Sequence, residues 1–276
     1  MLADQPGGPV RGSIVLLLAA CRAVDEAPQD LDAVLHDAWW AYDGAGDLGA
    51  AAEAMIALAD PDALLDEPVD GTQSRLTATE LTRVDLRAPP DDDGTWRLPD
   101  PALARPIFLL NRFTCDLDQL ERVLIHLDQD ALFEAYDAYS RSYTSDDAAF
   151  RDGATDVLTW EAVASASYFG AGSYTETLDG GVRRFDLAAG RGLAGRTWIP
   201  FPAHNDGGAI QLRQDYQIEV YVPWGDGDVL HLYGVWRELD LGALGTMEKD
   251  TVARVTLNNL AAWDDKVEAL CADGVP

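Results

Sequence analysis

Hydrophobic and polar residues alternate along much of the second half of the chain, a pattern that predicts β-strands. From Tyr216 to Val222, every second residue is apolar and the residues between them are mostly polar. This is typical of an antiparallel strand with one face buried and the other in water. The turn at 225–228 leads into a second apolar segment, 229–239. The two segments, 212–222 and 229–239, therefore predict a long antiparallel hairpin with one wet face.

Similar patterns predict more strands upstream. Glycines near 170–172 and the Asp179-Gly180-Gly181 sequence are interpreted as tight turns between them. The predicted strands are 80–87, 105–113, 157–169, 173–185 and 196–201.

Apolar residues at three- and four-residue spacing predict helices at both ends of the chain and one near its middle. The segments 31–42 and 48–59 are short and adjacent, so we expect a helical hairpin. A longer helix at about 117–138 should begin after the N-cap residue Asp116. The last helix, at about 249–271, has one apolar side, which should lie on the sheet.

The order of these elements predicts an α+β fold. Strands and a helix are followed by several antiparallel strands and a long closing helix. Over about residues 76–271, this order resembles the helix-grip fold of START and Bet v 1-like proteins. The resemblance implies a curved antiparallel sheet closed by a long C-terminal helix, with a cavity between them for an apolar small molecule or lipid. We therefore expect an α+β sheet domain at 76–276, preceded by the helical hairpin at 31–75.

The N-terminus carries a separate signal. Residues 13–20 form an unbroken run of small and apolar residues, which is too short to span a bilayer and typical of a signal peptide core. The run ends in Leu18-Ala19-Ala20-Cys21, which resembles the lipobox of bacterial lipoproteins. The alternative is that 13–20 form a buried strand or helical turn.

The lipobox resemblance implies a signal peptide at 1–20, a lipid on Cys21 and a solvated tether at 21–30. The partner of the chain would then be a membrane of the bacterial cell envelope. Arg22 follows the cysteine where an aspartate would retain many lipoproteins in the inner membrane, so the outer membrane is favoured.

Charge excludes one class of partner. The chain holds 20 Lys and Arg residues against 48 Asp and Glu residues, giving a formal net charge of −28. Such a surface repels phosphates, so we do not expect binding to nucleic acid. Apolar residues make up 47% of the chain, which is enough to form a real core.

With Cys21 lipidated, Cys115 and Cys271 remain. A pair of cysteines in an oxidising compartment favours a disulfide. The alternative is two buried free thiols.

Motifs for catalysis, metals and cofactors are missing from the sequence. It contains no GxSxG, P-loop or HExxH pattern, and its four histidines have no metal-ligand spacing. We therefore expect no metal, no cofactor and no catalytic residues. Glu161, Glu176, Asp215 and Glu219 lie on predicted strands and are candidates for an acid–base pair, although so many carboxylates also meet by chance.

Aromatic residues on the strands either fill a core or line an apolar pocket. His231 is expected to face the interior of the sheet, either as a hydrogen-bonded core residue or as part of a site. The candidate ligand-binding residues are Tyr216, His231, Tyr233, Trp236 and Trp263.

The pattern favours a membrane-tethered, non-enzymatic lipoprotein that binds an apolar small molecule or lipid. That hypothesis requires an enclosed cavity larger than about 300 Å³. Two alternatives remain: an envelope lipoprotein with a structural or interaction role and no ligand, and a cyclase- or hydrolase-like enzyme on the same fold.

Overall fold

A computed structural model places most of the chain after residue 103 and parts of the chain before it. The described residues are 25–26, 31–43, 48–59, 72–75, 103–168, 172–188, 190–205, 211–240 and 249–274. Cys21, the tether apart from 25–26, and the predicted strand at 80–87 lie outside these ranges.

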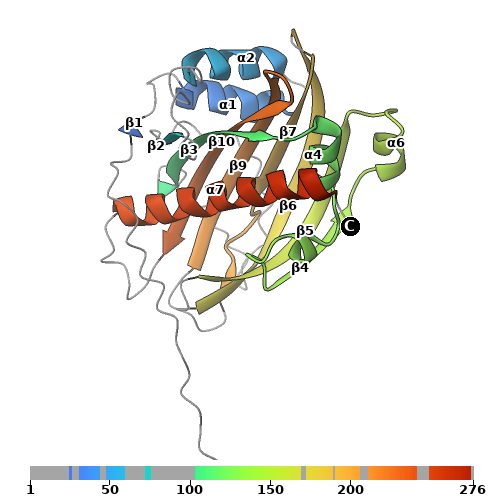
Figure 1. Cartoon of the computed structure of the whole chain (residues 1–276). Coiled ribbons are helices and arrows are strands. Elements are labelled where there is room, and N and C mark those ends of the chain that lie inside the picture. Colours follow the sequence, from blue (N-terminus) through green and yellow to red (C-terminus); the bar gives the residue numbers. More distant parts are fainter. Residues whose placement is uncertain are drawn as a thin grey trace, which may run out of the picture.

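One large, open and curved sheet dominates the fold (Figure 1). Neighbouring strands are antiparallel throughout, except that the two short strands at one edge pair in parallel. From one edge to the other the strands are β1 (Asp25–Glu26), β2 (Thr72–Arg75), β3 (Arg105–Thr114), β10 (Asp228–Asp240), β9 (Gln211–Trp224), β7 (Gly190–Trp198), β6 (Gly172–Leu187), β5 (Val157–Tyr168) and β4 (Ala138–Tyr143), with β8 (His204–Asn205) paired to β6.

Helices cover both sides of the sheet. The 25-residue helix α7 (Lys249–Asp273) runs across the strands (Figure 1). Helices α1 (Leu31–Ala41) and α2 (Leu48–Ala59) pack together on the opposite side. The remaining helices are short: α4 (Leu117–Leu124), α5 (Gln129–Leu132) and α6 (Asp147–Arg151).

Successive side chains of a strand point to opposite sides, so β3, β9 and β10 each contribute to two cores. The α1–α2 face is the side whose buried residues pack with Leu35 and Trp39 of α1: Phe108, Leu110, Tyr216, Ile218, Val220, Val222, Leu230, Leu232 and Trp236. The α7 face is the side whose apolar residues cluster with the helix residues Leu257 and Val267: Ile107, Leu109, Phe113, Tyr221, Val229, Tyr233 and Val235.

The hairpin of β9 and β10 and the long closing helix are confirmed, and with them the α+β fold class. The prediction that one face of the hairpin is wet is wrong. Its apolar face packs against α1, and on its polar face His231 contacts Asp264 of α7. Asp215 and His231, both on the polar face, are buried. An alternating pattern shows which face is more apolar, but it cannot show that a second helix covers the polar one.

The predicted helix at 117–138 is also wrong in its length, because α4 ends at Leu124. Asp116 is its N-cap, as expected, and accepts hydrogen bonds from the backbone N–H groups of Asp118 and Gln119. The buried Gln129 side chain donates to the carbonyls of Val123 and His126, and so satisfies the end of α4. The following chain forms α5 and then β4, which the sequence pattern did not predict.

The sequence Asp179-Gly180-Gly181 lies in the middle of β6 and is not a turn. A side chain at Gly180 would lie 2.7 Å from Nε1 of Trp160, and one at Gly181 would lie 2.6 Å from the hydroxyl of Tyr42. These glycines therefore make room for large side chains that cross the strand on its two sides.

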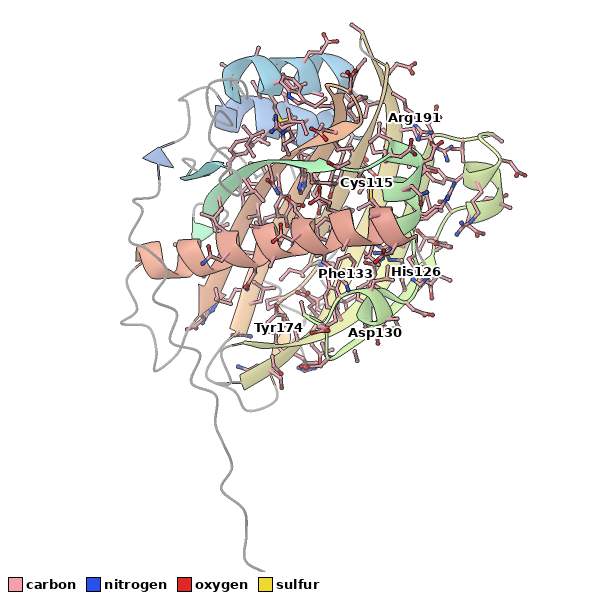
Figure 2. All side chains as sticks on the ribbon, viewed as in Figure 1. Cys115, His126, Asp130, Phe133, Tyr174 and Arg191 are labelled. Atoms are coloured by element: carbon pink, nitrogen blue, oxygen red, sulfur yellow. A yellow bond between two sulfur atoms is a disulfide. The ribbon has the colours of Figure 1, made fainter. Side chains whose placement is uncertain are left out.

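The predicted disulfide is present. Cys115, just after β3, is bonded to Cys271 in the last turns of α7, with 5.4 Å between their Cα atoms. Figure 2 shows Cys115 beside the C-terminal end of this helix. The bond fixes that end of α7 to the sheet.

Candidate ligand-binding site

The candidate site lies on the α7 face, where the helix crosses β3, β9 and β10. Polar side chains follow one another at the inward positions of β9: Asp215, Gln217, Glu219 and Tyr221. Asp215 and Tyr221 are buried, and Gln217 and Glu219 are half-buried. Buried polar groups are normally hydrogen-bonded, so the partners of these side chains define the site.

A histidine and an aspartate join β10 to α7. Nδ1 of His231 lies 2.8 Å from Oδ1 of Asp264, and the two side chains are only 2% and 0% exposed. Asn111, the cross-strand neighbour of His231 on β3, donates to Oδ2 of Asp264 at 2.9 Å. The contacts fix the aspartate from two strands and orient the imidazole ring.

The environment of His231 favours its protonated form. Burial lowers the pKa of the imidazole, but the charge and hydrogen bond of Asp264 outweigh burial, with a smaller contribution from Glu219, so the pKa is raised above its ordinary value. With the Nδ1 proton held by Asp264, the opposite nitrogen, Nε2, is completely buried and has no hydrogen-bond partner. It is one of six buried side-chain atoms without a partner among the described residues.

A second chain of contacts runs along β9 and β10. The hydroxyl of Tyr233 donates to Oε1 of Gln217, whose amide nitrogen donates to Oδ1 of Asp215 at 2.7 Å. The other carboxylate oxygen of Asp215 accepts from Nε of Arg237. The positions of these four side chains are therefore coupled across both strands.

Glu219 lies between the two groups of contacts. It is two residues from Tyr221, whose ring stacks on that of His231 with centroids 4.2 Å apart and whose hydroxyl donates to Oε2 of Glu219. Burial is the main reason that the pKa of Glu219 is raised, and the charge of His231 opposes the shift. Burial and the nearby Glu219 also raise the pKa values of Tyr221 and Tyr233.

A third carboxyl group extends the site to β6. Burial, followed by repulsion from Asp215, raises the pKa of Glu176 from 4.5 to about 8, and Arg237 offsets this only in part. Within the described part of the chain, Glu176 has no hydrogen-bond or ion-pair partner. It is thus largely uncharged at neutral pH, although its burial is only partial.

Aromatic rings border these polar groups. Trp263 of α7 stacks on Phe133 with centroids 5.1 Å apart and lies 6.3 Å from the ring of His231. Figure 2 shows Phe133 beside α7. On β4, the Arg141 guanidinium lies 4.1 Å from the centre of the Trp160 ring. The arrangement combines flat apolar surfaces with hydrogen-bonding groups, a combination typical of small-molecule sites.

The structure separates the predicted ligand-binding residues into two groups. His231, Tyr233 and Trp263 meet on the α7 face. Tyr216 and Trp236 lie on the α1–α2 face, packed in the core with Trp39. Neither residue contacts the polar cluster of the α7 face, so our proposals use only the first group.

Among the acid–base candidates, Glu176, Asp215 and Glu219 come to the α7 face, whereas Glu161 is exposed on β5. Sequence reasoning missed Asn111 and Asp264. Asp264 falls on the stripe of α7 that includes Leu257 and Val267, so a carboxylate at an apolar position was the available signal. Within the described ranges, no group of His, Cys, Asp and Glu residues is arranged to hold a metal ion.

Comparison with known proteins gives similarity in structure only. No protein-family model matches the chain, and no curated protein sequence does either. A START superfamily protein from Mycobacterium smegmatis has a TM-score of 0.41 and 10% identity, with 62% of this chain and 99% of that chain covered.

Two human structures are also similar to this chain. The StarD13 (DLC2) lipid transfer and protein localization domain has a TM-score of 0.38 and 14% identity, covering 64% of this chain and 79% of that one. StAR-related lipid transfer protein 5 has a TM-score of 0.38 and 8% identity, covering 61% and 76%. At these values the likeness carries no functional argument, so the proposals below rest on the residues of this chain.

None of the helices in the described ranges combines the length and the apolar character needed to cross a membrane.

Proposed function

We propose that this chain binds a small, largely apolar molecule with a polar group, held between the α7 face of the sheet and α7 itself. Stacked aromatic rings, including Trp263 on Phe133, provide surfaces for the apolar part. The polar cluster around His231 provides contacts for the polar group.

The observation that carries this proposal is the unpartnered Nε2 of His231. Leaving a buried polar atom without a partner costs about 1–3 kcal/mol. Five other described side chains have such an atom, and Tyr42, Trp198 and Trp236 among them belong to the α1–α2 core. His231 differs from these three because its ring lies in a polar cluster on the α7 face. Asp264 and Asn111 hold the imidazole in place and leave that one atom free. A bound molecule would satisfy it, whereas folding alone does not.

Native mass spectrometry of the full-length chain tests the proposal. We expect a non-covalent mass on the purified protein that is lost on denaturation. In His231→Leu, which replaces the ring by an apolar side chain, its occupancy should fall at least about tenfold, because a hydrogen bond in a buried site is worth roughly 1.5 kcal/mol or more.

The control is Glu161→Gln, on the exposed side of β5. It should retain the bound mass at the level of the unmodified chain. The absence of any bound mass, or equal occupancy in His231→Leu, would contradict the proposal and favour a structural or interaction role without a ligand.

We also propose that the chain is a lipoprotein of the bacterial envelope, held to a membrane by a lipid on Cys21. The lipobox-like sequence Leu18-Ala19-Ala20-Cys21 after a short apolar run supports this proposal. In a bacterial host, Cys21→Ser should move the chain from the membrane fraction to the soluble fraction. Globomycin should cause the unprocessed form to accumulate. A Cys21→Ser chain that stays in the membrane fraction would refute the anchor.

A further inference from the structure

The part of the α7 face formed by β4, β5 and β6 holds polar groups that the contacts around His231 do not use. Tyr139, Ala164 and Glu176 are direct cross-strand partners and form one row on this face. Neighbouring strands lie about 4.8 Å apart, so the Cα atoms of Tyr139 and Glu176 are roughly 10 Å apart with one small residue between them. Long side chains on both sides of Ala164 can therefore contribute to one site.

Tyr136, which lies between α5 and β4, packs beside this row. Its ring centroid is 5.0 Å from that of Tyr139. The ring contacts two apolar clusters, one that contains Ala164 and one that contains Phe133. Tyr136 therefore connects the row to the aromatic surface next to α7.

Two polar groups in this region have no hydrogen-bond partner within the described part of the chain: the hydroxyl of Tyr136 and the carboxyl of Glu176. The neighbouring hydroxyl of Tyr139 is engaged, because it accepts from Nε of Arg141 at 2.9 Å. Tyr136 and Glu176 are half-buried, and their polar atoms are not among the fully buried ones without a partner. In contrast to Nε2 of His231, these atoms keep accessible surface, so a polar group of a ligand can reach them.

Both groups are mostly uncharged at neutral pH. Burial is the main reason that the pKa of Tyr136 is raised, with smaller contributions from Tyr139 and from Glu176, which is thus close enough to Tyr136 to act on it. Burial also raises the pKa of Glu176 to about 8. A tyrosine hydroxyl and a protonated carboxyl each provide one donor and remaining acceptor capacity.

The surroundings disfavour a charged ligand group at this position. The guanidinium of Arg141 donates to the carbonyls of Leu124 and His126, and that of Arg237 pairs with Asp215. An anion would therefore meet guanidinium groups that are already engaged, and a cation would meet a carboxyl that is mostly protonated. A charged group that loses its hydration without gaining an opposite charge is strongly disfavoured.

We propose that an uncharged hydroxyl or carbonyl group of the bound molecule lies between Tyr136 and Glu176 and forms hydrogen bonds to both side chains. This inference rests on the proposed binding function and adds a second polar contact to the one at His231. The apolar part of the molecule then lies along the rings of Phe133 and Trp263, which stack on each other beside Tyr136.

Three probes with the same alkyl chain and different polar groups test this chemistry: decanol, decanoate and decylamine. Each is titrated into the full-length protein below its micelle concentration, with isothermal titration calorimetry as the readout. We expect decanol to bind at least about tenfold more tightly than either charged probe, because only decanol loses no charge hydration on binding.

Tyr136→Phe removes the hydroxyl and keeps the ring. The affinity for decanol should fall about fivefold, as expected for one hydrogen bond between uncharged groups. Tyr42→Phe is the matched control, because it removes a hydroxyl that also has no partner but belongs to the α1–α2 core. It should leave the affinity for decanol unchanged.

Two substitutions of Glu176 separate its hydrogen bonds from its charge. Glu176→Leu removes both donor and acceptor, so the affinity for decanol should fall about fivefold. Glu176→Gln retains an uncharged donor and acceptor and should bind decanol like the unmodified chain. Glu161→Leu, on the exposed side of β5, should also leave the affinity unchanged.

The outcomes distinguish this inference from the proposed binding function. If none of the three probes binds the unmodified chain, the binding function itself fails. If a charged probe binds as tightly as decanol, if Tyr136→Phe binds decanol as tightly as Tyr42→Phe, or if Glu176→Gln loses as much affinity as Glu176→Leu, binding stands and the uncharged contact is refuted. Tyr136→Phe is the smallest change and decides the matter if Glu176→Leu does not fold.

Discussion

The same two strands build two very different interiors. On the α1–α2 face, β9 and β10 present an almost wholly apolar surface, such as Ile218 and Leu232, to Trp39 and its neighbours on α1. On the α7 face, the alternate residues of those strands include buried acids and a buried histidine. Both interiors are covered by a helix, so solvent does not explain the difference.

The two faces differ in how much they contribute to stability and in the function that we propose for them. Apolar packing on the α1–α2 face stabilises the fold through buried area, at roughly 25 cal/mol per Å². The polar cluster on the α7 face contributes less, because each buried polar group must first lose its water. A fold that needed only a core would place apolar residues on both faces. This difference supports our proposal that the second face binds a ligand, while the first face stabilises the fold.

The largest effect should come from the α1–α2 face. Trp39 is buried and contacts the rings of both Trp198 and Tyr216. Trp39→Ala should lower the free energy of unfolding by about 3–5 kcal/mol, measured by chemical denaturation. Trp40→Ala, at the neighbouring and partly buried position, should cost less than half as much. A loss of ligand binding in folded Trp39→Ala would contradict the proposal that the two faces have separate roles.

The disulfide should have the next largest effect, and on the α7 face. It closes a sequence separation of 156 residues and holds the C-terminal end of α7. Replacing Cys115 and Cys271 by alanine should lower the free energy of unfolding by about 2–4 kcal/mol and weaken ligand binding together with it. Reduction of the unmodified chain should reproduce both effects. Unchanged thermal unfolding in the double variant would contradict the role of this bond.

The contact between β3 and α7 is a smaller test. Asn111→Ala removes the amide that donates to Asp264, which is fully buried. We expect a loss of about 2 kcal/mol in denaturant unfolding, the range for hydrogen bonds to charged groups. Asn258→Ala, at an exposed position of α7, should change stability by less than about 0.5 kcal/mol. Equal effects of the two variants would show that the buried contact adds nothing.

The smallest effect concerns pH. The pKa of Glu176 is about 8 in the folded chain and lies near 4.5 when unperturbed. The folded state therefore holds this proton longer than the unfolded state. Its contribution to stability is complete below pH 4.5 and is lost as the pH rises towards 8.

Glu176→Gln should thus stabilise the chain at pH 8, by about 1–2 kcal/mol once partial exposure is allowed for, and should have no effect near pH 4. Thermal unfolding at both pH values provides the measurement. Glu161→Gln, in an exposed position, should show no such dependence. A Glu176→Gln variant that is less stable than the unmodified chain at pH 8 would contradict the buried location of this carboxyl.

Much of this fold was predictable from periodicity. The hairpin of β9 and β10, α1, α2 and α7 all follow from regular spacing of apolar residues. The disulfide was predicted from the two cysteines that remain besides Cys21 and from the expected oxidising compartment. The elements that were missed depend on tertiary contacts. The end of α4 is stabilised by the side chain of Gln129, a residue that follows the helix and is not part of its apolar spacing. Strand β6 continues through Gly180 because the side chain of Trp160 occupies the space where a Cβ atom would lie.

The site was less predictable. His231 and Tyr233 were singled out as aromatic residues on a strand, but the same reasoning also chose Tyr216 and Trp236, which face the other way. Alternation assigns residues to two faces without identifying which helix covers each one. Asp264 comes from a helix 33 residues away from His231 in sequence, so only the folded chain brings the two together.

The central claim is that the ligand lies on the α7 face. Photolabelling tests it most directly: a diazirine-bearing analogue of decanol is bound to the full-length chain, irradiated and mapped by peptide mass spectrometry. We predict labels in α7, within residues 249–274, and protection from labelling by excess decanol, with none in 31–59. Labels concentrated in α1 and α2, or labelling of α7 that excess decanol does not reduce, would contradict the account.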